Sequence, residues 1–63
     1  MTFKQLLKQK GFTQEQLADE LQITQVAVSK WVCGKSTPTR DNMLKIANVL
    51  NVDTMLVIKC FYN

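Results

Sequence analysis

The side chains best suited to recognition chemistry lie between residues 24 and 30, in the run Thr-Gln-Val-Ala-Val-Ser-Lys. An amide such as that of Gln25 can form two hydrogen bonds to the edge of adenine, and a lysine such as Lys30 can donate to guanine. Val26, between them, is an apolar residue that could pack on a thymine methyl group. This stretch therefore has the residue types needed to read the edges of DNA base pairs.

Side chains that could support catalysis or hold a metal are few. The chain contains no histidine, and its two cysteines, Cys33 and Cys60, stand far apart. Zinc sites normally need four ligands at short, paired spacings. The sequence also lacks a phosphate-binding glycine loop and a pair of carboxylates suited to acid–base work. We therefore expect no enzymatic activity, no metal and no cofactor. A buried or inert Cys33 is the preferred interpretation, and a regulatory thiol is the alternative.

Length and composition describe a small globular protein. The 63 residues form one domain, residues 1–63, with no room for a second. Hydrophobic residues make up 46% of the chain and charged residues 21%, a balance typical of a folded domain. Eight Lys and Arg against five Asp and Glu give a net charge of +3. A charge this small is compatible with a nucleic-acid partner without requiring one.

The sequence shows no targeting or membrane segment. Charged residues interrupt the first twenty positions, so there is no apolar core of a signal peptide. No run approaches the roughly 18 apolar residues that a membrane span needs. Nothing else points to secretion, so we expect reduced thiols rather than a disulfide. The expected location is the cytoplasm, with neither a membrane nor a small-molecule substrate as partner.

Four threonines precede runs with helical periodicity, and threonine is a favoured helix N-cap. Thr2 and Thr13 are each followed three positions later by glutamine, which is the capping-box spacing. Gly11 stands where a helix must end in a left-handed conformation, and Asn51 is of the next most suitable type. These signals predict helices over about residues 2–10, 14–21 and 40–50, and a further one from the Thr24 cap to Cys33-Gly34.

Apolar residues recur at helical spacing, which predicts the buried face of each helix. The expected buried residues are Phe3, Leu6 and Leu7, then Leu17, Ala18 and Leu21, then Val28, Trp31 and Val32, and finally Met43, Leu44, Ala47 and Leu50. Only a few residues separate the second helix from the third. Such a short connection does not allow antiparallel packing, so the two helices must cross steeply.

The segment after Asp53 has two interpretations. Asp53 is a suitable N-cap for a helix over residues 54–59, but the run Met-Leu-Val-Ile-Lys-Cys-Phe-Tyr is also rich in strand-forming residues. We favour a short helix followed by an extended end.

Residues spread from Gly11 to Leu56 together form a family pattern. They are Phe12-Thr13-Gln14, Leu17, Ala18, Leu21, Ile23, Thr24-Gln25, Val28, Trp31, Gly34-Lys35, Pro38, Leu44-Lys45-Ile46-Ala47 and Leu50. This pattern resembles the helix-turn-helix domains of phage Cro and lambda-type repressors. The resemblance implies an all-α, compact lambda-repressor-like DNA-binding domain of four to five helices, with the helix-turn-helix at its second and third helices.

The chain departs from this family at two places. The turn position that usually holds glycine is Gln22, and a left-handed conformation strains such a residue by about 1 kcal/mol or more. The stretch after Asp53 lacks the acidic residues common in relatives, which bears on dimerisation rather than on DNA reading.

With its apolar stripe turned inward, the third helix presents its remaining residues to the outside. The candidate base contacts are Gln25, Val26, Ala27, Ser29 and Lys30, because a recognition helix places its N-terminal residues in the major groove. The resemblance independently implies base contacts at Gln25, Val26 and Lys30. The alternative for Val26 is a core position.

Candidate phosphate contacts bracket this helix. Gln14 opens the second helix, whose free amides favour an anion. The resemblance implies backbone contacts there and in the loop after the third helix. The full set is Gln14, Thr24, Lys35, Ser36, Thr37 and Arg40. A merely solvated role is the alternative for Lys35 and Arg40, and it is the preferred one for Lys4, Lys8 and Lys10.

A monomer that reads about five base pairs is too unselective among the competing sites of a genome. We therefore expect a homodimer on a pseudo-palindromic double-stranded DNA operator, with half-sites about one helical turn apart. Apolar residues in the tail exceed what one small core can cover. The expected dimer interface lies within residues 52–61, at Val52, Met55, Leu56, Ile58 and Phe61.

The leading hypothesis is a transcriptional regulator, most similar to a Cro-like phage or prophage repressor because no further domain follows in these residues. One alternative is an antitoxin-type autorepressor, which adjacent genes would distinguish. The other is a protein-interaction module without DNA specificity, which would dock a partner through Val26 and Ala27 or through the apolar tail.

Overall fold

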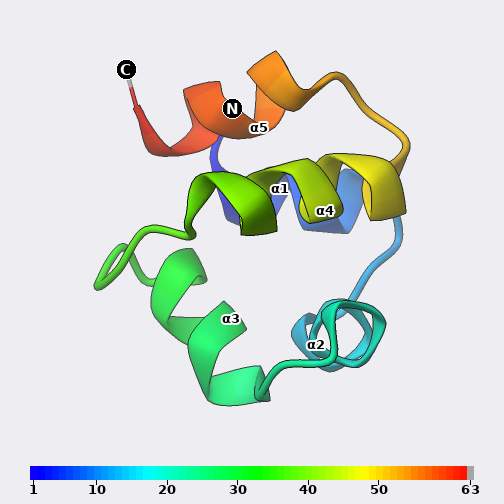
Figure 1. Ribbon diagram of the computed structural model, residues 1–63, viewed down its shortest axis with the longest axis vertical. Helices are drawn as coiled ribbons and strands as arrows, with labels where there is room; N and C mark the ends of the chain where they lie inside the picture. The colour runs from blue at the N-terminus through cyan, green and yellow to red at the C-terminus, as the bar shows by residue number, and fades with distance from the viewer. Residues whose placement is uncertain (63) are drawn as a thin grey trace.

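The computed structural model describes residues 1–62 as five helices, with no strand among them. The helices are α1 (Phe3–Gln9), α2 (Gln14–Leu21), α3 (Gln25–Val32), α4 (Arg40–Leu50) and α5 (Thr54–Phe61) (Figure 1). The all-α class expected from the sequence is therefore confirmed. None of these helices is long and apolar enough to cross a membrane.

Threonine side chains start the first four helices, as their spacing predicts. The Thr2 hydroxyl accepts a hydrogen bond from the Gln5 amide at 3.1 Å, and the Thr2 amide donates to Gln5 Oε1 at 2.9 Å. Thr13 and Gln16 repeat this reciprocal box at 3.0 and 2.9 Å. Each box satisfies amide groups that would otherwise lack partners at the start of the helix. These local bonds explain why α1 and α2 begin where the sequence indicates.

The first four helices are followed by a residue in the left-handed conformation. Two of these positions hold glycine, and the other two hold Gln22 (φ 57°) and Asn51 (φ 57°). Behind Gln22, the Ile23 amide donates to the Ala18 carbonyl at 3.0 Å, the bond expected of a Schellman motif. The left-handed turn expected at Gln22 is thus present, although the residue there is not glycine.

We expect Gln22→Gly to raise the free energy of unfolding by about 0.5–1 kcal/mol, since glycine relieves left-handed strain but loses more chain entropy on folding. Thermal unfolding followed by circular dichroism measures this as a higher melting temperature. Gln9→Gly is the matched control because Gln9 lies within α1, where glycine should lower stability by a similar amount. A lower melting temperature for Gln22→Gly would show that the turn relies on the glutamine side chain.

The core draws one fully buried apolar side chain from each helix. These are Leu6, Leu17, Val28, Ile46 and Val57, all 0% exposed. Aromatic rings close one end of this core. The ring of Phe3 lies edge-on to that of Trp31, with centroids 6.5 Å apart, and 5.0 Å from the ring centroid of Phe61. Phe3 of α1 thus contacts both Phe61 of α5 and Trp31 of α3, so these three aromatic rings pack the first and last helices against α3.

One predicted core position in α4 is wrong. Leu44 was expected in the buried stripe, but its side chain is 44% exposed, whereas Ile46 is fully buried. Met43, Ile46, Ala47 and Leu50 follow the i, i+3, i+4, i+7 spacing of a single helical face. Leu44 is one residue, about 100° of rotation, beyond Met43 and falls at the edge of that face.

The helix interpretation of the tail is correct, and the helix is longer than expected. It starts at the Asp53 cap, whose carboxylate accepts from the Met55 amide at 2.9 Å, and it runs to Phe61 rather than residue 59. The extended conformation begins only at Tyr62, with φ −127° and ψ 112°. Val57 anchors this helix in the core, and its other apolar residues are half-buried or exposed.

The helix-turn-helix predicted at the second and third helices is present at α2 and α3. In Figure 1, α2 is viewed nearly along its axis while α3 crosses it steeply at the lower left. Helix α2 packs against both α3 and α4. Ala18, in the buried stripe of α2, is only 2% exposed. A small side chain at this position allows the packed helices to approach closely.

Candidate nucleic-acid interface

The two faces of α3 have opposite environments. Val28 and Trp31 are 0% and 6% exposed and hold the helix to the core. Gln25 and Lys30 are exposed, and Val26 is 63% exposed although it is apolar. The core position that was the alternative for Val26 is therefore excluded. Val26 is therefore accessible on the outer face of α3, between an amide and a lysine.

The other two candidate base contacts lie at the edges of this face. Ala27 and Ser29 are both half-buried, as is the inward residue Val32. The Ala27 amide is bound to the Thr24 hydroxyl at 3.3 Å, which places Thr24 at the exposed tip of α3 as its N-cap. The outer face of α3 thus has Gln25, Val26 and Lys30 as its most accessible side chains.

The loop after α3 is folded back on the end of that helix. The Lys35 amide donates to the Lys30 carbonyl at 2.9 Å, and the Ser36 amide approaches the same oxygen at 3.4 Å. Lys35, Ser36 and Thr37 are all exposed. Pro38 is buried and fixes the far end of the loop. Two cations, Lys30 and Lys35, are thereby held on one short segment of surface.

The remaining two candidate phosphate contacts lie at helix starts. Gln14 is the first residue of α2, directly after the Thr13 cap, and is half-buried. Arg40 is the first residue of α4 and is exposed. Arg40 lines a hollow with Pro38, Thr39, Met43, Ile58 and Tyr62 rather than the hollow that contains Lys30 and Lys35. The structure therefore brings Lys30 and Lys35 together and leaves Arg40 beside α5.

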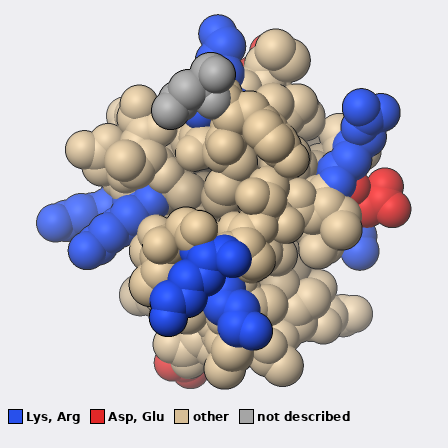
Figure 2. Space-filling view, turned by 90° about the vertical axis from the view of Figure 1, so that its left-hand side faces the viewer, with Lys and Arg blue, Asp and Glu red and all other residues tan. Residues whose placement is uncertain are grey.

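Figure 2 shows the side of the molecule that carries the loop between α3 and α4. Lysine and arginine side chains project from the middle and the margins of this face, while acidic side chains are visible only at its margins. Near α3 the cations are Lys30 and Lys35, in a chain whose net charge is +3. A cationic surface of this kind attracts anionic groups, phosphates among them.

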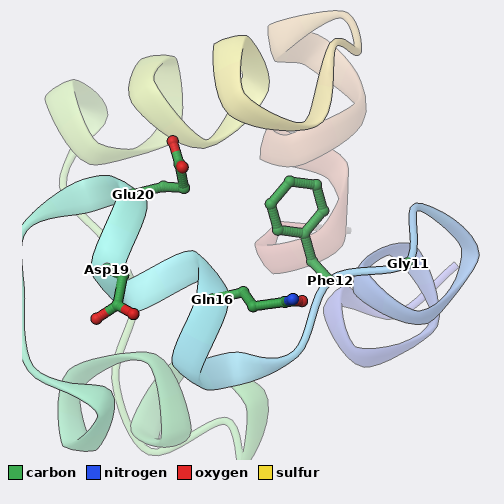
Figure 3. A pocket seen from close by; sticks show the side chains of 5 residues that line it. All are labelled: Gly11, Phe12, Gln16, Asp19 and Glu20. Carbon is green, nitrogen blue, oxygen red and sulfur yellow. The ribbon is translucent and has the colours of Figure 1, made fainter.

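A third hollow lies on α2, and its side chains form no catalytic arrangement. Its lining residues are Gly11, Phe12, Gln16, Asp19 and Glu20. Figure 3 shows that the carboxylates of Asp19 and Glu20 point in different directions from α2. Gln16 is engaged in the Thr13 capping box. The two acids are therefore not paired for acid–base work, and residues 1–62 contain no cluster of potential metal ligands.

The two cysteines are free thiols in different environments. Of the preferred interpretation of Cys33 as buried or inert, the buried position is wrong, because Cys33 is exposed at the end of α3; an inert thiol and a regulatory thiol both stay predictions. Cys60 is half-buried on α5, and its thiol donates to the Leu56 carbonyl at 3.3 Å. Burial raises the pKa of the Cys60 thiol, and the nearby N-terminal amine only partly opposes this effect. Because the thiolate is the reactive form of cysteine, this raised pKa makes the Cys60 thiol less reactive.

Sequence reasoning missed one feature of the candidate interface. Val26, Ser29, Lys30, Cys33 and Lys35 line a shallow hollow on the outer side of α3. Residues 26, 29, 30 and 33 follow helical i, i+3, i+4, i+7 spacing, which is the signal that could have identified the stripe. Cys33 thereby belongs to the exposed side of α3 that also carries Val26 and Lys30.

Comparison with protein families gives a match to the family described as Helix-turn-helix, over residues 3–56. The match includes α1 to α4 and the start of α5. No solved structure matches the chain.

Two curated relatives are similar over most of the chain. The HTH-type transcriptional activator BcrR of Enterococcus faecalis is 38% identical over 56 residues, covering 82% of this chain and 28% of the relative. An SPbeta prophage-derived HTH-type transcriptional regulator of Bacillus subtilis (strain 168), YonR, is 36% identical over 50 residues, covering 79% of this chain and 46% of the relative. The chain thus spans less than half of either relative. It belongs to the helix-turn-helix family of the Cro and lambda-repressor type, a family of DNA-binding transcriptional regulators.

Proposed function

We propose that the protein binds double-stranded DNA sequence-specifically by placing the outer face of α3 in the major groove. The observation that carries this proposal is the division of α3 into a buried side, Val28 and Trp31, and an exposed side with an amide, an apolar side chain and a cation. Gln25 can bind adenine through two hydrogen bonds, and Lys30 can donate to guanine O6 or N7. Ala27 and Ser29, which are half-buried at the edges of this face, would make additional, less accessible contacts.

Backbone contacts on both sides would fix this helix in the groove. The amides at the start of α2, beside Gln14, favour one phosphate. Lys35, Ser36 and Thr37 favour another beyond the end of α3, with Thr24 and Arg40 at the two flanks. Phosphate contacts orient the protein, while sequence preference comes from the base edges. Their cationic part makes affinity fall as salt concentration rises.

We propose further that the protein acts as a homodimer on a pseudo-palindromic operator, with half-sites about 34 Å apart. The candidate interface is the α5 segment. Val52, Leu56, Ile58 and Phe61 are half-buried and pack partly against the protein's own core, and Met55 is 56% exposed. These neighbouring apolar side chains, all at least partly exposed, support a self-contact, because contiguous exposed apolar surface marks interaction sites.

The proposed activity is that of a Cro-like phage or prophage repressor, which blocks transcription by occupying its operator. The similarity to a prophage-derived regulator supports the phage association. Selection of bound duplexes from a random library tests sequence-specific binding, and a reporter driven by a promoter that contains the selected duplex tests repression. Increased reporter expression would contradict repression, and equal binding to all duplexes would favour an interaction module instead.

We expect Lys30→Ala to relax the preference at one base pair by about 1–3 kcal/mol while the fold is retained. Lys35→Ala is the matched control, since both lysines are exposed in the same hollow. It should weaken all duplexes similarly and reduce the slope of log affinity against log salt by about 1. Competition binding with single-base variants of the selected duplex measures both effects. If Lys30→Ala weakened every duplex equally, Lys30 would be a phosphate contact.

We expect Met55→Glu to convert the dimer into a monomer, because it places a charge on the exposed apolar part of α5. Sedimentation velocity measures the change in mass, and the circular dichroism spectrum should remain helical. Leu44→Glu is the matched control on α4, where an apolar side chain is also exposed but lies outside the proposed interface. A dimer that survives Met55→Glu would place the interface elsewhere.

A further inference from the structure

The two cysteines of the chain line one hollow, although they stand far apart in the sequence. Cys33 is the C-cap of α3, and Cys60 lies in the last turn of α5. The ring of Phe3 lies between these two helix ends, with its centroid 6.5 Å from that of Trp31 and 5.0 Å from that of Phe61. The aromatic contacts that close the core therefore also hold the two cysteines at the same hollow.

The loop that follows α3 lines the same hollow through Gly34, Ser36 and Thr37. Ser36 and Thr37 are exposed and belong to the loop proposed above to contact a phosphate. Apart from its chain neighbours, no heavy atom lies within 4 Å of the position that a Cβ of Gly34 would occupy, so the backbone beside Cys33 has room to adjust. A bond between Cys33 and Cys60 would thus tie the start of this loop to α5.

The two thiols differ in their access to solvent. Cys33 is exposed, so it is the thiol that a reagent in solution meets first. Cys60 is half-buried, and its thiol donates to the Leu56 carbonyl at 3.3 Å. A thiol is a weak donor, so the Cys60 side chain can rotate away from this carbonyl at little cost. The raised pKa of Cys60 slows its attack on a solute, but an attack within the molecule benefits from the high effective concentration of its target.

We propose that Cys33 and Cys60 are a redox-sensitive pair, which a small-molecule disulfide converts into an intramolecular disulfide that weakens DNA binding. The Cys33 thiolate attacks one sulfur of the small-molecule disulfide, forms a mixed disulfide and releases one thiolate. The Cys60 thiolate then attacks the Cys33 sulfur and displaces the second thiolate. Two protein thiols are thereby oxidised to one disulfide, and the small-molecule disulfide is reduced to two thiols. The free thiols of the structure are the reduced state.

The effect on DNA binding rests on the proposed function, in which the loop after α3 contacts a phosphate. A disulfide requires the two Cα atoms to lie within about 7 Å of each other, so the bond fixes the end of α3 close to α5. The loop then adopts its position from α5 instead of following the DNA backbone. We expect the Kd to rise about tenfold per half-site, which corresponds to the loss of two hydrogen bonds of ordinary strength at Ser36 and Thr37.

The experiment treats the reduced chain with hydroxyethyl disulfide, which is small and uncharged, at a protein concentration low enough to suppress links between chains. After the remaining thiols are alkylated, trypsin cleavage at Lys30, Lys35 and Lys59 places the cysteines in two peptides, residues 31–35 and a peptide that begins at Cys60. Mass spectrometry without reductant should find these peptides joined. Fluorescence anisotropy with the selected duplex at fixed salt should show the weaker binding of the oxidised chain, and dithiothreitol should restore the affinity.

Two variants separate the disulfide from simple modification of one thiol. Cys60→Ser retains Cys33, so the reagent can leave only a mixed disulfide on this residue. Cys33→Ser retains Cys60 and cannot form the first intermediate at an exposed thiol; because Cys33 is exposed, this substitution leaves the core intact. Each variant is compared with its own reduced form, and neither should lose affinity for the duplex on treatment.

The outcomes separate this proposal from the proposed function. If the two peptides are not joined, or are joined only between chains, the redox pair is wrong and sequence-specific binding stands. A disulfide that leaves the Kd unchanged overturns the regulation, and so does an equal loss of affinity in Cys60→Ser, which would assign the effect to an adduct on Cys33. If the reduced chain selects no duplex, the proposed function fails and the regulation fails with it, while the peptide map still decides whether the two thiols pair.

Discussion

Replacing Gln25 with alanine is expected to weaken binding to the selected duplex by about 1–3 kcal/mol per half-site, or about 5- to 150-fold in Kd. Gln25 is the first residue of α3 and is exposed, so its amide is in the position from which a recognition helix contacts bases. Alanine removes both hydrogen bonds of a bidentate contact and leaves the adenine edge without partners. In a dimer the loss occurs at both half-sites and is correspondingly larger.

Gln9→Ala is the matched control for this effect. Gln9 is also an exposed glutamine, at the end of α1, and is not part of the proposed interface. Titrations of each variant with the selected duplex and with single-base variants separate lost contacts from lost selectivity. Gln25→Ala should lose most on the adenine-containing duplex. An equal loss on all duplexes would show that Gln25 contacts the backbone rather than a base.

Replacing Ala18 with leucine is expected to lower the free energy of unfolding by about 1–3 kcal/mol. Ala18 is 2% exposed within α2, which packs against both α3 and α4. A larger side chain must therefore separate packed helices or adopt an unfavourable rotamer. In a domain of about this size, each 1 kcal/mol corresponds to about 4–8 °C in melting temperature. Thermal unfolding of the variant measures the change directly.

Ala27→Leu provides a comparison at a position of the same residue type. Ala27 is half-buried on α3, so the added atoms have access to solvent and the melting temperature should change much less. A wild-type melting temperature for Ala18→Leu would contradict the close packing of α2. Because α2 sets the position of α3, Ala18→Leu should also weaken DNA binding under conditions in which the protein remains folded.

Much of the secondary structure follows from residues close together in the sequence. Thr13 with Gln16, and Thr2 with Gln5, define helix starts through bonds that span only three residues. The left-handed ends depend equally on local conformation. For this reason the bounds of α2 and α4 match the expected ranges, and the short turn at Gln22 requires α2 and α3 to cross. The family match agrees with the same local pattern.

The tail illustrates the limit of local signals. The α5 segment combines a helix cap at Asp53 with several residue types that favour strands. The cap alone therefore does not determine how far the helix extends. Packing of Val57 into the core and of Phe61 against Phe3 adds contacts that are remote in sequence. These contacts extend the helix beyond residue 59. They also use part of the apolar surface that the sequence suggests for dimerisation.

The sequence by itself determined the helix-turn-helix and the residue types on α3, because caps, turns and helical periodicity are properties of neighbouring residues. Only the tertiary structure decided which faces were exposed. It showed Leu44 exposed on α4, and it showed Val26 and Cys33 exposed along one side of α3. The exposure of a side chain depends on how neighbouring helices are placed around it. The spacing of residues along one helix does not specify that placement. The sequence consequently determines which residue types lie on the outer side of α3, and the packing of the other helices determines which of them are exposed.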